Sequence, residues 1–121
     1  MSLENNINQK IMSLVSDFNQ KNYDLVIEKS LKLLDEEDPI FIIYNLIGAS
    51  YSFKDQHIKA INYFLKAIDL EPKNDELYRN LGKSLIKVEK YDDATEAFNQ
   101  SIKLKSTNAD CYFNLGLINL K

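Results

Sequence analysis

Side chains that could do chemistry are few and scattered in this sequence. The chain has one histidine, His57, and one cysteine, Cys111. Nucleophilic and acid–base catalysis need a nucleophile within hydrogen-bonding reach of a base, and the pattern around His57 supplies no such partner. A cysteine with no second cysteine or histidine nearby predicts neither an internal disulfide nor a metal site. We therefore expect no enzyme, no cofactor and no metal, with Cys111 as a free thiol on or beside a packed helix.

Two groups of carboxylates have structural explanations. The acidic run at 35–38 lacks the alternating ligand spacing and the sharp-turn glycine of a calcium-binding loop, so it predicts the solvated end of a helix. Asp92 and Asp93 are expected to open a helix, where the helix dipole favours negative charge. The first group therefore does not indicate a calcium site, and the second needs no acid or base role.

A row of basic side chains indicates the binding of anions. Arg79, Lys83 and Lys87 are spaced at i, i+4 and i+8 and stack along one side of a helix. Asn80 and Asn114 are 34 residues apart, and their amides could hold a peptide backbone. Cations beside amides favour an acidic peptide or a C-terminal carboxylate. The alternative is that these cations only solvate a helix face.

The composition favours packed helices in a single domain. The chain has 121 residues, of which 45% are hydrophobic and 27% charged, with three glycines and two prolines. A net charge of −3 suggests neither nucleic acid nor an anionic membrane as partner. The sequence has no apolar run long enough for a membrane span and no signal-peptide pattern. We expect a cytoplasmic protein without membrane insertion.

The sequence repeats itself every 34 residues, because Gly48, Gly82 and Gly116 are separated by that interval. Glycine inside a helix costs about 1 kcal/mol relative to alanine, so we expect a second helix to approach Gly48 and Gly82 closely. Asp38–Pro39, Asn74 and Asn108 are candidate caps for the helices that follow them. Other residues recur at the same interval: Tyr44, Tyr78 and Tyr112; Ala60 and Ala94; Phe64 and Phe98.

This pattern resembles the tetratricopeptide repeat family, whose unit places an aromatic residue, Leu-Gly, Tyr, Ala, Phe and Pro at fixed offsets. Residues 41–74 and 75–108 match it as repeats, 109–121 matches its first half, and 7–40 reads as a divergent first repeat. The resemblance implies one domain over 1–121. It also implies an all-α, right-handed superhelix of antiparallel helix pairs, with about seven helices.

The resemblance further implies that the first helix of each unit lines a concave groove that holds an extended peptide. Certain family members clamp acidic chaperone tails with Lys, Asn and Arg. Arg79 and Asn114 match that clamp by type, whereas Lys83 stands where the clamp has Asn. We expect apolar pockets at Ile42, Leu46 and Phe53. The predicted groove residues are Ile42, Asn45, Leu46, Ala49, Phe53, Arg79, Asn80, Lys83, Lys87 and Asn114.

The last helix is expected to leave apolar side chains uncovered, whereas terminal repeats normally have a polar outer face. These side chains are Phe113, Leu117, Ile118 and Leu120. Either the chain is a fragment of a longer repeat protein, or it forms a homodimer through this helix.

The function that we predict is a protein–protein interaction scaffold, or adaptor, that binds an extended, acidic peptide in its groove. Two alternatives stay open. The chain could be a non-catalytic targeting or regulatory part of a larger multidomain protein or enzyme. It could also be an assembly module that self-associates through its C-terminal helix.

Overall fold

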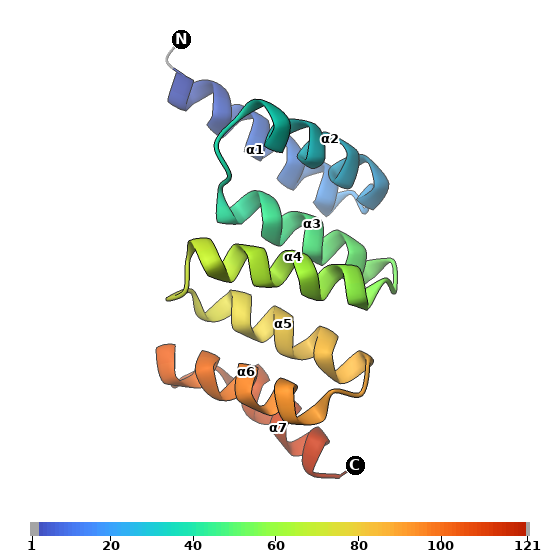
Figure 1. Ribbon diagram of the computed structural model, residues 1–121, viewed down its shortest axis with the longest axis vertical. Coiled ribbons are helices and arrows are strands. Elements are labelled where there is room, and N and C mark those ends of the chain that lie inside the picture. The colour runs from blue at the N-terminus through green and yellow to red at the C-terminus, as the bar shows by residue number, and fades with distance from the viewer. Residues whose placement is uncertain (1–2, 121) are drawn as a thin grey trace.

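The computed structural model describes residues 3–120 and contains seven α-helices and no strand in that range (Figure 1). The predicted all-α fold with about seven helices is therefore confirmed; residues 1, 2 and 121 of the predicted domain lie outside the described residues. The helices are α1 (Leu3–Asn19), α2 (Tyr23–Glu36), α3 (Phe41–Phe53), α4 (His57–Leu70), α5 (Asp75–Lys87), α6 (Tyr91–Leu104) and α7 (Ala109–Asn119).

One of the three predicted caps is present and two are not. The Oδ1 of Asn74 accepts a hydrogen bond of 3.0 Å from the backbone N–H of Glu76, which confirms the cap of α5. The cap at Asp38–Pro39 was wrong, because α3 begins at Phe41 and its N-cap is the extended residue Ile40, which packs against the core. Asn108 makes no side-chain cap to α7, because its buried amide bonds elsewhere.

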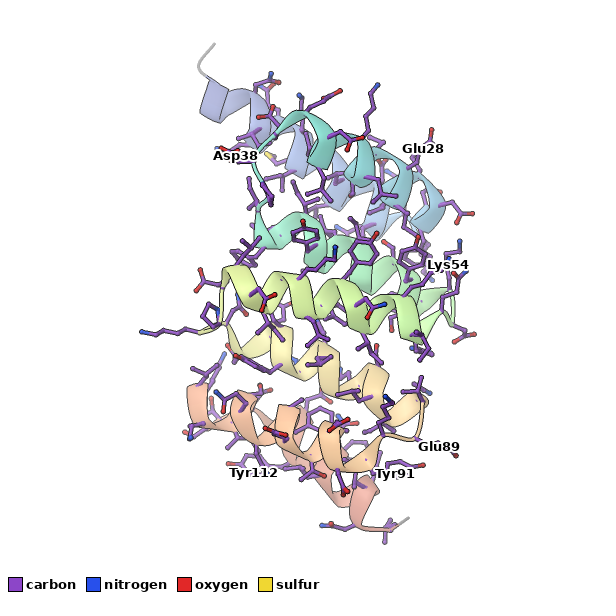
Figure 2. All side chains as sticks on the ribbon, viewed as in Figure 1. Glu28, Asp38, Lys54, Glu89, Tyr91 and Tyr112 are labelled. Atoms are coloured by element: carbon purple, nitrogen blue, oxygen red, sulfur yellow. The ribbon has the colours of Figure 1, made fainter. Side chains whose placement is uncertain are left out.

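The turn inside each helix pair has the same backbone conformation. Lys21, Asp55 and Glu89, spaced 34 residues apart in the sequence, have φ values of 64°, 59° and 63°. This left-handed conformation costs roughly 1–2 kcal/mol for a residue with a Cβ. Figure 2 places Lys54 and Glu89 along one edge of the molecule and Asp38, which joins α2 to α3, on the opposite edge. The chain therefore reverses at alternating edges, as antiparallel helices require.

The helices form two layers of unequal spacing. Figure 1 shows α2 in front of α1 and α6 in front of α7. Cα atoms of α1 and α3, of α3 and α5, and of α5 and α7 approach within 8 Å, whereas none of α2 and α4 or of α4 and α6 do so among the described residues. The odd-numbered helices are thus the closer-packed layer, and the stack curves with them on its inside. We call their solvent-facing side the inner face.

Contact between a glycine and a phenylalanine sets the spacing inside two helix pairs. A Cβ added at Gly48 would lie 2.7 Å from the Phe64 ring, and one added at Gly82 would lie 2.7 Å from the Phe98 ring. Both rings are almost fully buried, at 1% and 0% exposure. The expected close approach is therefore confirmed. Gly116 differs, because a Cβ there would meet no atom within 4 Å.

Three tyrosines pack between α3 and α4, and we call them the tyrosine cluster: Tyr44, Tyr51 and Tyr63. The Tyr63 ring centroid lies 5.8 Å from that of Tyr51 and 6.2 Å from that of Tyr44. Burial, with smaller contributions from Tyr51 and Tyr44, raises the pKa of the Tyr63 phenol above its ordinary value of 10.0. The folded state therefore favours the neutral phenol.

We predict that Gly48→Ala and Gly82→Ala each destabilise the protein by about 1–3 kcal/mol, because the new methyl group overlaps a fully packed ring and the surrounding core must shift. Gly116→Ala is the matched control. It meets open space, so it should be neutral or stabilise by up to about 1 kcal/mol through helix propensity. Urea unfolding followed by circular dichroism measures all three. A Gly82→Ala variant as stable as the parent would contradict the close contact.

Tyr63 should make folding stability sensitive to alkaline pH. Its stabilising contribution is fully present below the pKa of the unfolded phenol, near 10, and is lost as pH rises through the higher pKa of the folded state. We expect the free energy of unfolding to fall less steeply across this alkaline range in Tyr63→Phe than in the parent chain. Urea titrations at a series of pH values measure both slopes, and equal slopes would rule out a raised phenol pKa.

Candidate functional site

The inner face carries three asparagine amides that hydrogen-bond to the protein itself, one pair across two helices and one amide within α7. The Nδ2 of Asn80 on α5 donates a hydrogen bond of 3.1 Å to the Oδ1 of Asn45 on α3. The Nδ2 of Asn114 on α7 donates to the backbone oxygen of Asp110 at 2.8 Å and to its carboxylate at 3.2 Å. All three asparagines are half-buried. The amides thus bond first to the protein itself and keep further lone pairs and N–H groups for a ligand.

Two of the three predicted basic residues on α5 are paired with a carboxylate from α7, the neighbouring helix of the inner layer. The Nζ of Lys83 lies 2.6 Å from the Oδ2 of Asp110, and the Nε of Arg79 lies 3.9 Å from the same oxygen. The Lys83 and Asp110 side chains are 47% and 43% exposed. An ion pair this exposed contributes about 0–1 kcal/mol to stability. A second carboxylate could therefore replace Asp110 at small cost.

The buried side chain of Asn108 supports the side chain of Arg79. Its Oδ1 accepts from the guanidinium of Arg79 at 3.0 Å, and its Nδ2 donates to the Oγ of Ser101 at 2.9 Å and to Asp75 at 3.3 Å. The Ser101 hydroxyl in turn donates to the backbone oxygen of Asp75 at 2.9 Å. Because Asn108 is 7% exposed and Ser101 is fully buried, this network holds Arg79 in place at the junction of α5, α6 and α7.

Lys87 is the unpaired member of the basic row. Its side chain is exposed and makes no ion pair with another described residue. It lies at the end of α5 beside a cavity of about 420 Å³, whose lining also includes Asp55, His57 and Lys59. Arg79, Lys83 and Lys87 lie on one helix, as predicted. The positive charge that no described carboxylate pairs with lies at the Lys87 end of this row.

The apolar positions of the predicted groove do not gather into one pocket. Leu46 is 9% exposed and packs in a core cluster with Leu14, while Ala49 packs against the neighbouring core cluster. Phe53 is 64% exposed and stacks on Tyr23, with ring centroids 5.2 Å apart. Ile42 lies three turns away at the other end of α3 and is half-buried. The polar residues of α5 and α7 therefore form the most continuous part of the inner face.

Three of the four residues predicted for self-association are exposed at the C-terminal helix, and the fourth packs toward the core. Phe113, Leu117 and Leu120 are exposed by 65%, 38% and 83%. Their spacing of i, i+4 and i+7 places them on one stripe. Ile118 instead packs toward the core cluster that contains Cys111. The exposed apolar stripe therefore contains three of the four residues that the sequence predicted for it.

Residues that catalysis or metal binding would use are dispersed. His57 Nε2 lies 3.6 Å from Asp55 at the start of α4, and Cys111 is a free, buried thiol, as expected. No cluster of three or more His, Cys, Asp or Glu suited to a metal ion occurs among residues that the structure describes. No helix in the same part of the chain combines the length and apolar character of a membrane span.

Two features were missed by the reasoning from sequence. Asp110 was not identified as the partner of Lys83, because only the packing of α7 on α5 brings the two together. The second feature is a cavity of about 570 Å³ between α4 and α6. The replacement of Tyr51 by Leu85 one period later is a sequence signal for it.

Comparison of the sequence with protein families gives three matches. A model described as TPR repeat matches residues 83–121, and two described as tetratricopeptide repeat match residues 63–96 and 42–74. Together they extend over 42–121. No curated protein matches the sequence.

Solved structures resemble the chain over most of its length. The first TPR of Spaghetti (RPAP3) bound to the HSP90 peptide SRMEEVD has a TM-score of 0.86 at 19% identity, covering 93% of this chain and 92% of that one. The second TPR domain of human RPAP3, in complex with the HSP70 peptide SGPTIEEVD, has a TM-score of 0.87 at 16% identity and 93% coverage of both chains. The Sgt2 TPR domain from Aspergillus fumigatus has a TM-score of 0.84 at 20% identity, covering 93% of this chain and 76% of that one. These similarities confirm the superhelical fold.

Proposed function

Because this chain belongs to the tetratricopeptide repeat family, we propose that it is a protein-interaction scaffold whose inner face binds an extended, acidic peptide. The helix pairs α3–α4 and α5–α6 are the repeats 41–74 and 75–108 of this proposal, preceded by a divergent repeat at 7–40 and followed by a half repeat from 109. The scaffold positions its partner without catalysing a reaction. A cytoplasmic location stays a prediction.

The observation that carries the proposal is the carboxylate of Asp110 on Lys83 and Arg79. This ion pair supports a carboxylate-binding position on the inner face, formed by the same two helices, α5 and α7, that carry Asn80 and Asn114. The peptides named with two similar structures end in Glu-Glu-Val-Asp, so they carry carboxylates of this kind. A bound peptide would exchange its own carboxylate for Asp110 and place its backbone against the asparagine amides.

The peptide SRMEEVD is a suitable probe, and its affinity can be measured by fluorescence polarisation. Lys83→Glu should weaken binding at least about tenfold, because it places a negative charge where the carboxylate binds. Asp110→Asn should strengthen binding about two- to fivefold, because it removes the competing carboxylate from an ion pair worth at most about 1 kcal/mol.

Lys103→Glu on α6 is the matched control for charge, since it makes the same reversal on an exposed lysine of the outer layer. It should leave the affinity for SRMEEVD unchanged. Weaker binding in Asp110→Asn, or equal losses in Lys83→Glu and Lys103→Glu, would contradict an inner-face site. If the parent chain does not bind the peptide, the assembly module or a regulatory role within a larger protein becomes the better explanation.

The exposed stripe on α7 favours self-association as a second candidate function. Phe113, Leu117 and Leu120 form an apolar strip that a second copy could cover about a two-fold axis. We expect light scattering at high protein concentration to give twice the 14.0 kDa mass of one chain. Phe113→Glu combined with Leu120→Glu should restore the single-chain mass without unfolding the protein, because both side chains are largely exposed. A parent chain that stays monomeric would reject the dimer.

A further inference from the structure

The outer layer contains a cavity that lies away from the inner face. The cavity of about 570 Å³ lies between α4 and α6, and the buried side chains Leu81 and Leu85 of α5 form its floor. We call it the outer channel. Its volume falls within the range of about 300–1,000 Å³ typical of ligand sites. Figure 1 shows α5 running between α4 and α6, and side chains of α4 and α6 line the two sides of the cavity.

The equivalent space one repeat earlier is filled by the protein itself. There the tyrosine cluster packs over α3, and cations cover its rings. The Nζ of Lys59 lies 5.4 Å from the Tyr51 centroid, and the Nζ of Lys66 lies 5.8 Å from the centroids of both Tyr44 and Tyr63. The residues one period later, in the same order as Tyr44, Tyr51 and Tyr63, are Tyr78, Leu85 and Ala97.

Two aromatic rings are therefore absent from the outer channel, and the cations above them are absent as well. The counterparts of Lys59 and Lys66 are Asp93 and Gln100, and both line the channel. Ala97 lines the channel and stands where the preceding repeat has Tyr63, so α6 contributes a methyl group there in place of a phenol ring. The protein's own filled site thus defines what would fit: an aromatic ring with a cation beside it.

The walls of the channel are apolar on α4 and acidic on α6, which suits an aromatic ring with a cation beside it. Ile58 and Leu65 on α4 are 60% and 46% exposed, which leaves apolar surface beside the opening. Asp93 and Glu96 on α6 are exposed and make no ion pair with another described residue. Lys90 contributes one positive charge to the lining against these two negative charges. An apolar floor with an acidic wall favours an aromatic anchor followed by a basic residue.

We propose that the outer channel is a protein-binding site for a peptide segment that inserts an aromatic side chain over Leu85 and Ala97 and places a lysine or arginine against Asp93 and Glu96. The segment takes the positions that Tyr51, Tyr63 and Lys59 occupy one repeat earlier. Because the channel lies on the outer layer and Lys83 lies on the inner face, the chain can hold two different partners at once.

The experiment selects random 12-residue peptides displayed on phage against the immobilised full chain. The most enriched peptide is then synthesised, labelled and titrated by fluorescence polarisation. Enriched sequences should pair Phe, Tyr or Trp with a nearby Lys or Arg. Leu85→Tyr combined with Ala97→Tyr, which restores the residues of the preceding repeat, should weaken binding of the synthetic peptide at least about tenfold.

A second variant keeps the test valid if the filled channel disturbs folding. Asp93→Lys combined with Glu96→Lys changes only exposed side chains and should also weaken binding about tenfold. Lys83→Glu on the inner face should leave the affinity unchanged, which separates this site from the SRMEEVD site. The proposal is overturned if no basic aromatic peptide is enriched, if the charge-reversed variant binds as tightly as the parent, or if Lys83→Glu causes the same loss.

Discussion

The contact between one glycine and one phenylalanine in each of the helix pairs α3–α4 and α5–α6 sets the geometry of the central part of the molecule. Gly48 and Gly82 carry no Cβ, so the rings of Phe64 and Phe98 lie directly against the helix backbone. A Cβ at either glycine would overlap the ring, so the ring or the helices would have to move. The spacing of α3 from α4, and of α5 from α6, therefore depends on the absence of a Cβ at each glycine. The inner face and the outer channel depend on that spacing in turn.

Unequal packing of the two layers explains why the two faces differ. The odd-numbered helices approach one another closely, so their polar side chains meet across helix boundaries, as in the hydrogen bond between Asn80 and Asn45. The even-numbered helices do not approach one another, so side chains must fill the space between them. Tyr63 fills one such space, whereas Ala97 leaves the next one open. Curvature thus makes a polar inner face and a channelled outer layer from the same repeat.

Part of the charge on the inner face is paired within the chain. Asp110 lies against both Lys83 and Arg79, and Asn108 holds the arginine from a buried position. In the proposed function a ligand carboxylate competes with this internal one, so specificity would depend on the difference between two similar interactions. The half-exposed pair costs little to open, which suits reversible binding.

The sequence alone determined the helix pairs and their order, because the glycine interval and the apolar spacing are local properties of the chain. It also determined the cap at Asn74, the close approach at Gly48 and Gly82, and the basic row on α5. Only the tertiary structure decided what each surface residue contacts. Leu46 packs in the core, and Asn108 belongs to a hydrogen-bond network instead of capping α7. Asp110 lies against Lys83. Each of these contacts joins residues from different helices, which only packing brings together. The outer channel also required three dimensions, since the cavity results both from Leu85 and Ala97 standing where the preceding repeat has tyrosines and from the distance between α4 and α6.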